Sequence, residues 1–132
     1  MTTRTLVMLS AGLEAATGLA LIAVPEFVAR LLLGASLSDS GIAVGRVAGF
    51  ALLSLGVACW PGGDDPTAHV TWALFTYNLL AGLYLGYLRV GGGFVSYLLW
   101  PACLVHLLLA LLLARPAYGT GSAAKAAPAK RQ

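Results

Sequence analysis

The sequence is short of charged residues, and this shortage decides its class. Charged residues make up 10% of the 132 residues, whereas soluble domains usually contain about 25%. Hydrophobic residues make up 59%, and the mean hydropathy is +0.86. This composition excludes an ordinary soluble domain and indicates an integral membrane protein.

The chain also lacks the motifs of common enzymes and metal proteins. Its two cysteines, Cys59 and Cys103, form no CxxC pair and define no metal or redox site. We find no nucleophile motif and no dinucleotide-binding loop. A metal bound by Glu14, Cys103 and His106 has no ligand-spacing motif to support it. We therefore predict a protein that is not an enzyme, with no catalytic residue and no metal.

Positive charge is sparse and collects at the C-terminus. The net charge is +3, and Lys125, Lys130 and Arg131 lie among alanine, glycine, serine and proline in a tail, residues 119–132. This tail has no interleaved aromatic residues and no dense basic block, which argues against nucleic-acid binding. We expect a flexible segment near anionic lipid head groups.

The sequence is rich in apolar runs long enough to cross a bilayer, since about 20 helical residues span its hydrocarbon core. The predicted spans are residues 5–24, 41–60, 68–88 and 94–114. Residues 25–34 are too few to span, so we expect an interfacial helix that begins at Pro25 and stops at Gly34. The predicted fold is all-α: a four-helix membrane bundle over residues 1–118, with Pro101 kinking the last span.

Three polar residues fall at one depth in these spans. Glu14 lies at the centre of the first span, where a carboxyl group must face protein or water. Counted from the side of the termini, Glu14, Asn78 and His106 lie roughly 14, 15 and 13 Å deep. We expect them to meet, so that Glu14 and His106 can share a proton while Asn78 bonds to both. Arg46 either joins this acidic group or extends to the membrane surface.

Glycines give the second and third spans smooth faces. Gly41, Gly45 and Gly49 follow one another at intervals of about one helical turn, as do Gly82 and Gly86. Small residues let helices approach closely in lipid, where packing replaces the hydrophobic driving force. We predict that these glycines pack against neighbouring helices of the same chain.

Two resemblances bear on function. The motifs GLxLxxxP at 18–25, LLLG at 31–34 and LLWPAxxxH at 98–106, with an arginine in the second span, resemble small bacterial inner-membrane proteins of the DoxX-like type. This resemblance covers the layout of residues 5–115 and implies a four-helix membrane fold, sometimes associated with quinone-linked redox partners. The segment AGLEAATG also resembles the membrane-embedded glutamate of small multidrug resistance transporters, where that carboxylate binds cations and protons. Only Glu14 carries over from that second resemblance.

Our functional hypothesis is a non-enzymatic, multi-pass protein of the bacterial inner membrane with a polar pocket at the midplane. Glu14, Asn78, His106 and Arg46 would form this pocket for a small lipophilic or protonatable ligand. No cofactor is predicted, although the family resemblance would allow a quinone. The expected partners are the lipid bilayer and either a larger membrane complex, such as a quinone-linked redox complex, or further copies of the chain.

Two alternatives stay open, and the charges predict a topology. One alternative is a proton-coupled exporter acting as a dimer, and the other is a structural subunit whose polar residues only fix the helix register. Positive charges favour the cytoplasmic side of a membrane. The side of the termini carries Arg4, Arg115 and the basic tail, against Arg30, Arg46 and Arg89 opposite. We therefore expect both termini in the cytoplasm.

Overall fold

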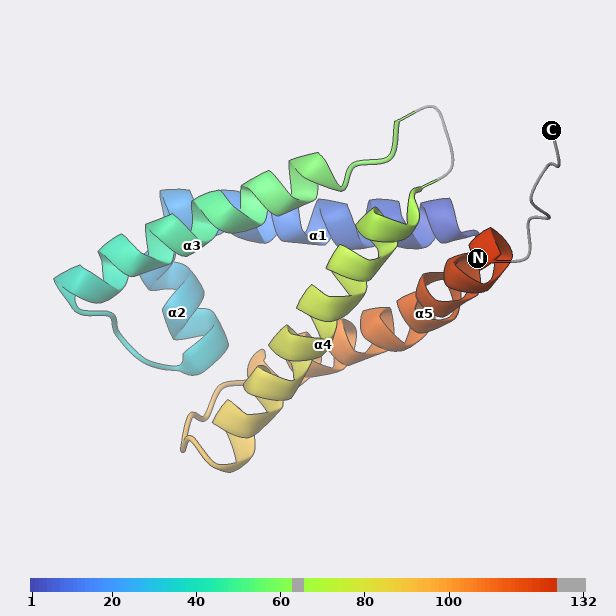
Figure 1. The fold of residues 1–132 in the computed structure, drawn as a ribbon. Helices are drawn as coiled ribbons and strands as arrows, with labels where there is room; N and C mark the ends of the chain where they lie inside the picture. The colour runs from blue at the N-terminus through green and yellow to red at the C-terminus, as the bar shows by residue number, and fades with distance from the viewer. Residues whose placement is uncertain (63–65, 126–132) are drawn as a thin grey trace, which may run out of the picture.

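The computed structural model describes residues 1–62 and 66–125, with side chains described as far as Tyr118. This part of the chain forms five helices and no strand (Figure 1). In chain order they are α1 (Thr3–Ala23), α2 (Pro25–Leu33), α3 (Asp39–Ala58), α4 (Ala68–Val90) and α5 (Leu99–Lys125). The predicted all-helical class is confirmed.

The long helices form two pairs. Helix α1 packs along α3, and α4 packs along α5, as Figure 1 shows. Contacts between the two pairs run mainly through α1, and α3 does not pack on α4 or α5. The short connection after α4 makes α4 and α5 antiparallel neighbours, as expected for helices joined by few residues. The two pairs are therefore in contact at one end of the protein and spaced apart at the other.

They touch at the end that holds the start of α1 and the later part of α5. A core of buried side chains joins α1, α4 and α5 there, with a contribution from the residue that follows α3: Leu6, Val7, Ala11, Cys59, Leu74 and Leu113. An aromatic cluster adds to the α4–α5 contact at this end, because Trp72 and Phe75 each pack edge-on against Tyr118. This core does not extend to the opposite end of the two pairs.

Glycine lets α1 and α3 approach closely. A Cβ added to Gly18 would lie 2.7 Å from the carbonyl oxygen of Gly49, and one added to Gly56 would lie 2.6 Å from that of Ala11. Both distances are too short for any side chain. Gly45 has more room, since its added Cβ would lie 3.4 Å from Pro25, and Gly41 lies over the start of its own helix.

The α4–α5 pair uses a similar device. A Cβ added to Gly82 would lie 2.7 Å from Leu107, while Gly86 lies against the sulfur of Cys103. The Cys103 thiol donates a hydrogen bond to the carbonyl of Gly82, at 3.3 Å. Small residues thus mark the closest approach within each pair.

Helix α2 is joined to the rest of the protein at both ends. Proline at its first position fits a helix start, and Gly34 ends it with φ of 70°. The Glu26 carboxylate accepts hydrogen bonds from the Arg30 side chain and the Leu37 amide, both at 2.8 Å. The Ser96 hydroxyl donates to the carbonyl of Leu31. Its length predicts a helix that lies at the membrane surface. The hydrogen bonds show that α2 is also attached to the segments that precede α3 and α5.

Helix α5 differs from the predicted fourth span at both ends. It begins at Leu99, so Pro101 lies in the first turn, where proline removes no hydrogen bond within the helix. The kink predicted at Pro101 is therefore absent. The helix also continues past Pro116 to Lys125, into the segment predicted as a flexible tail. Residues 126–132 of that tail lie outside the described part of the chain.

Three helical stretches are long and apolar enough to cross a membrane: Thr3–Ala23, Asp39–Ala58 and Leu99–Tyr118. Helix α4 has 23 residues but is not among them. Its sequence includes Asn78 and three tyrosines, which lower its hydropathy. Three helices are therefore long and apolar enough to indicate a membrane protein. Helix α4 is as long as these helices but less apolar.

The attachment of α2 should depend on pH through Glu26. Hydrogen bonds from Leu37 and Arg30 lower the pKa of this carboxyl from its usual 4.5. Its contribution is therefore complete above pH 4.5 and is lost as the pH falls through the lower, folded pKa. We expect Glu26→Gln to unfold at a lower temperature than wild type at pH 7, with a difference that shrinks below pH 4.5.

Thermal unfolding followed by circular dichroism in detergent measures this difference. Asp39→Asn is the matched control, because Asp39 also lies in a first helical turn but makes no side-chain hydrogen bond within residues 1–62 and 66–118. A Glu26→Gln difference that stays constant from pH 7 to about pH 3 would contradict the proposed role of the carboxylate.

Candidate ligand and proton site

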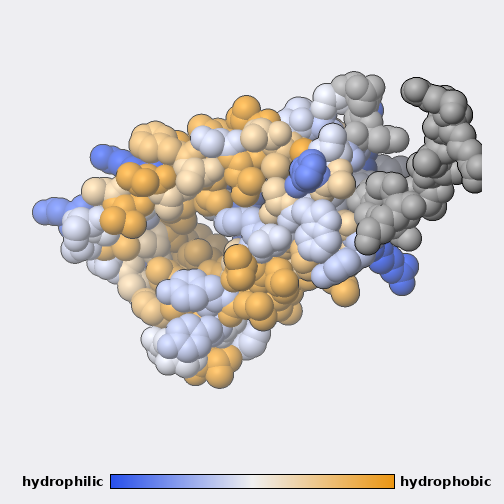
Figure 2. Space-filling view, in the orientation of Figure 1, coloured by the Kyte–Doolittle hydropathy of each residue, from blue (hydrophilic) through white to orange (hydrophobic). Residues whose placement is uncertain are grey.

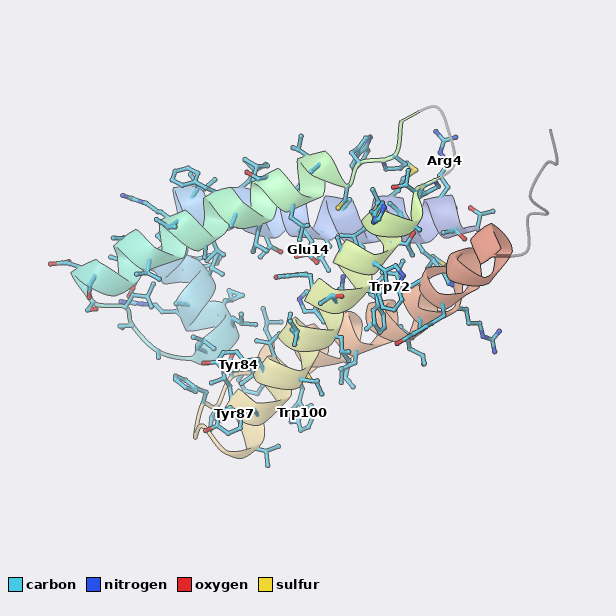
Figure 3. All side chains as sticks on the ribbon, in the orientation of Figure 1. Arg4, Glu14, Trp72, Tyr84, Tyr87 and Trp100 are labelled. Carbon is cyan, nitrogen blue, oxygen red and sulfur yellow. The ribbon has the colours of Figure 1, made fainter. Side chains whose placement is uncertain are left out.

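Two buried polar residues of α1, Ser10 and Glu14, face the second helix pair. Figure 3 shows Glu14 on the side of α1 that is turned toward α4. Glu14 is 0% exposed, and neither of its carboxyl oxygens has a hydrogen-bond partner. Among the described side chains these two oxygens are the only buried nitrogen or oxygen atoms left in that state. A buried carboxyl group without partners is unfavourable and calls for an explanation.

Asn78 is the residue that joins the helices at this level. Its Nδ2 donates to Ser10 Oγ on α1 at 2.7 Å and to the carbonyl of Leu74 on α4 at 2.9 Å. Its Oδ1 lies 2.9 Å from His106 Nδ1 on α5. Three helices are thereby connected through one buried amide, which has no free hydrogen-bonding atom for Glu14.

His106 lies between Asn78 and Glu14. Its Nδ1 is 4.0 Å from Glu14 Oε1, too far for a hydrogen bond and close enough for an ion pair only if His106 is protonated. Tyr77 packs edge-on against the imidazole, with the ring centroids 5.9 Å apart, and also interacts with the Glu14 carboxyl without hydrogen-bond geometry. The predicted trio of Glu14, Asn78 and His106 therefore meets at His106. Asn78 bonds to His106 but not to Glu14, so the predicted bond between Asn78 and Glu14 is absent.

Two members of this cluster were not among the predicted site residues. Ser10 is one turn before Glu14 on the same face, so its helical spacing could have identified it. Tyr77 precedes Asn78 in the sequence and points in a different direction around α4, so no periodicity could have placed it beside Glu14.

An apolar cavity of about 430 Å³ adjoins this cluster. It lies between α1, α2, the later part of α4 and the start of α5, where the two helix pairs separate. Figure 2 shows the molecule hollowed between the two pairs, with mainly apolar residues around the hollow. The lining includes Leu13, Val28, Leu85 and Val105, and its only polar members are Thr17 and His106. The cavity thus ends at the imidazole.

His106 is the contact between the cavity and the buried cluster. Its side chain is 14% exposed, and one edge of the ring faces Asn78 while the residue also lines the cavity. A molecule in the cavity could therefore exchange a hydrogen bond or a proton with His106. Through His106 it could also sense the protonation state of Glu14, which is 4.0 Å away.

The structure places Arg46 away from this cluster. Gly56 packs at the level of Ala11 and Ala15, close to Glu14. Arg46 precedes Gly56 on α3 and therefore lies about 15 Å farther along the helix axis. Its exposed side chain lines a separate open groove with Glu26 and Arg30. Arg46 does not contact the residues with which it was grouped in the sequence-based site.

Metal binding has no support from the side chains that the structure describes. Within residues 1–62 and 66–118, no three histidine, cysteine, aspartate or glutamate side chains gather to hold an ion. Cys103 is buried and bonds to α4, and Cys59 belongs to the core near the termini.

Comparisons with protein-family models, with curated proteins and with solved structures find no match for this chain. The resemblances to DoxX-like proteins and to small multidrug resistance transporters stay predictions from sequence layout. The functional argument therefore depends on the geometry of the site.

Proposed function

We propose that the chain is a non-enzymatic protein of the bacterial inner membrane, with α1, α3, α4 and α5 as four spans and both termini in the cytoplasm. Three of these helices have the length and apolarity of spans. The fourth, α4, packs along α5 and buries Thr71 and Asn78, which keeps these two polar side chains away from lipid. Only Arg89 is charged in α4.

We further propose that the cavity holds a small lipophilic ligand whose polar group lies at His106. One observation carries this proposal: an apolar cavity of about 430 Å³ ends at an imidazole that is linked to Asn78 and lies 4.0 Å from an unpartnered Glu14 carboxyl. Small-molecule sites typically have about 300 to 1,000 Å³, mostly apolar walls and a few polar groups that fix orientation. The cavity has these properties.

Quinone-type molecules belong to this ligand class, since they combine an apolar body with polar ring oxygens. The proposal thus includes service as an accessory subunit of a larger, quinone-linked membrane complex. The unpartnered carboxyl of Glu14 supports a second candidate, a proton-coupled exporter acting as a dimer, because a proton or cation would satisfy it. Proton release on addition of tetraphenylphosphonium, lost in Glu14→Gln, would favour that exporter.

Binding of 4-octylphenol in lipid nanodiscs, measured by calorimetry, tests the ligand site. Ala102 lines the cavity, so Ala102→Trp should fill it and weaken binding by about tenfold or more. Ala73→Trp is the matched control, because Ala73 is exposed on α4 and does not line the cavity. Equal affinity in the two variants, or no saturable binding to wild type, would reject the ligand site and favour the structural subunit.

A further inference from the structure

The orientation of the Asn78 amide fixes the position of a proton on His106. The carbonyl of Leu74 can only accept, so the atom of Asn78 that faces it, at 2.9 Å, must be the NH₂ group. The other amide atom, Oδ1, then faces His106 Nδ1 at 2.9 Å and can only accept. His106 Nδ1 must therefore carry a hydrogen and donate it to Asn78.

The surroundings of Glu14 argue that His106 is otherwise neutral. An ion pair would place a charge on Glu14, whose two oxygens are buried and receive no hydrogen bond. A buried pair is tolerated only when further hydrogen bonds satisfy the charged atoms. The neutral acid beside a neutral imidazole avoids this penalty. A neutral imidazole protonated at Nδ1 has an unshared electron pair at Nε2.

The Nε2 atom is accessible, and His106 lines the cavity. It makes no hydrogen bond to any described residue, yet it is not among the buried unpartnered atoms, which are the two oxygens of Glu14 alone. His106 lines the cavity and its side chain is only 14% exposed, so the cavity is the space from which a molecule would approach Nε2. The polar end of the cavity therefore presents a hydrogen-bond acceptor.

We propose that the cavity selects lipophilic molecules whose head group donates a hydrogen bond, such as alcohols and phenols, and that His106 Nε2 accepts it. This inference rests on the proposed ligand site and specifies the ligand that the site takes. A head group that only accepts, such as an ether or a ketone, would bring its oxygen against the electron pair of Nε2. For a quinone-type ligand, the reduced form with its hydroxyl groups would be the one bound.

The proton position can be measured without any ligand. The chain has two histidines, and the His69→Gln variant leaves His106 as the only one. Nitrogen-15 NMR of the labelled imidazole distinguishes a protonated nitrogen from an unprotonated one. We expect Nδ1 to be protonated and Nε2 to be unprotonated at pH 7. The opposite tautomer, or an imidazolium with both nitrogens protonated, would overturn the inference.

A matched set of ligands tests the selection in nanodiscs of one lipid composition. We expect 4-octylphenol to bind about tenfold more tightly than 4-octylanisole, whose methyl ether cannot donate. Octylbenzene, which is smaller than the phenol, should also bind more weakly, and this controls for the added methyl group. The His106→Phe variant, which keeps a ring but no acceptor, should bind all three with similar affinity.

Arg46→Gln is the control variant, since Arg46 lines a separate groove and should leave the preference unchanged. Equal binding of the phenol and the ether to wild type would overturn the inference while the ligand site stands. Absence of saturable binding for all three compounds would reject the ligand site as well.

Discussion

Gly49→Ala is expected to lose about 2 kcal/mol of stability, whereas Gly45→Ala, one turn earlier on the same helix, should lose almost none. A Cβ on Gly49 would lie 2.8 Å from the carbonyl oxygen of Gly18 and 2.9 Å from Ile22, so the backbones of α1 and α3 would have to separate. A Cβ on Gly45 would lie 3.4 Å from Pro25, which is ordinary contact. The two variants make the same chemical change, so helix propensity favours both equally.

Equilibrium unfolding of the detergent-solubilised protein measures the two free energies. Leucine at these positions should enlarge the contrast, because Gly49→Leu cannot be accommodated without opening the α1–α3 pair. Indistinguishable stabilities for Gly45→Ala and Gly49→Ala would show that this ridge does not pack on α1. It would then face lipid or a partner.

The helices could be predicted because each depends on a signal local to the sequence. Long apolar runs, the Pro25 start and the Gly34 stop place α1 to α4 close to their observed bounds. The start of α5 was predicted too early because residues 94–98 are mainly apolar, and apolarity alone does not distinguish helix from turn. Pro101 was interpreted as a kink inside the span, although proline also suits a first helical turn, where the structure places it.

The level of the polar cluster could also be predicted, because helical rise converts residue counts into depth. Its hydrogen bonds were predicted only in part. The structure contains the predicted bond between Asn78 and His106 but leaves Glu14 without one. Such a choice depends on the rotation of each helix and on side-chain rotamers. Arg46 was grouped with the cluster as a long charged side chain that could extend to it, but it lies in another groove.

The sequence predicted a polar pocket formed by Glu14, Asn78, His106 and Arg46, but the cavity is apolar and only His106 of these four lines it. The cavity exists because the two helices within each pair pack more closely than the two pairs pack on each other. Helix α2 covers the gap that results. Packing of this kind is a property of the assembled helices. No residue pattern in a single helix reports it.

Glu14→Met and Asn78→Leu should change stability in opposite directions, although both replace a fully buried polar residue with an apolar one of similar size. The carboxyl oxygens of Glu14 have no partners, so Met should raise the free energy of unfolding, by about 1 to 3 kcal/mol. Asn78 bonds to Ser10, Leu74 and His106. Its loss leaves these groups unpaired and should lower the free energy by about 2 kcal/mol.

The sign of the change in unfolding free energy on Glu14→Met shows whether Glu14 is kept for function or for structure. A protein retains an unfavourable buried carboxyl when activity requires it, and removing such a group commonly stabilises the fold. A plug residue would instead destabilise the protein when it is removed. Equilibrium unfolding in one detergent gives both values. A loss of stability in Glu14→Met comparable to that in Asn78→Leu would mean that Glu14 has partners in the membrane, and the proposed proton role would fail.

A double-mutant cycle then identifies which pair is coupled. We expect Asn78→Leu and His106→Phe to be non-additive by about 1 kcal/mol, because each removes one partner of the same 2.9 Å contact. Glu14→Met and His106→Phe should be closer to additive, since 4.0 Å separates their nearest atoms and no hydrogen bond joins them. Strong coupling of Glu14 to His106 with none at Asn78 would reverse the assignment of Asn78 as the bridge. If Asn78 and His106 are coupled and Glu14→Met is stabilising, Glu14 is the buried group of the site that is kept to bind a proton or a ligand.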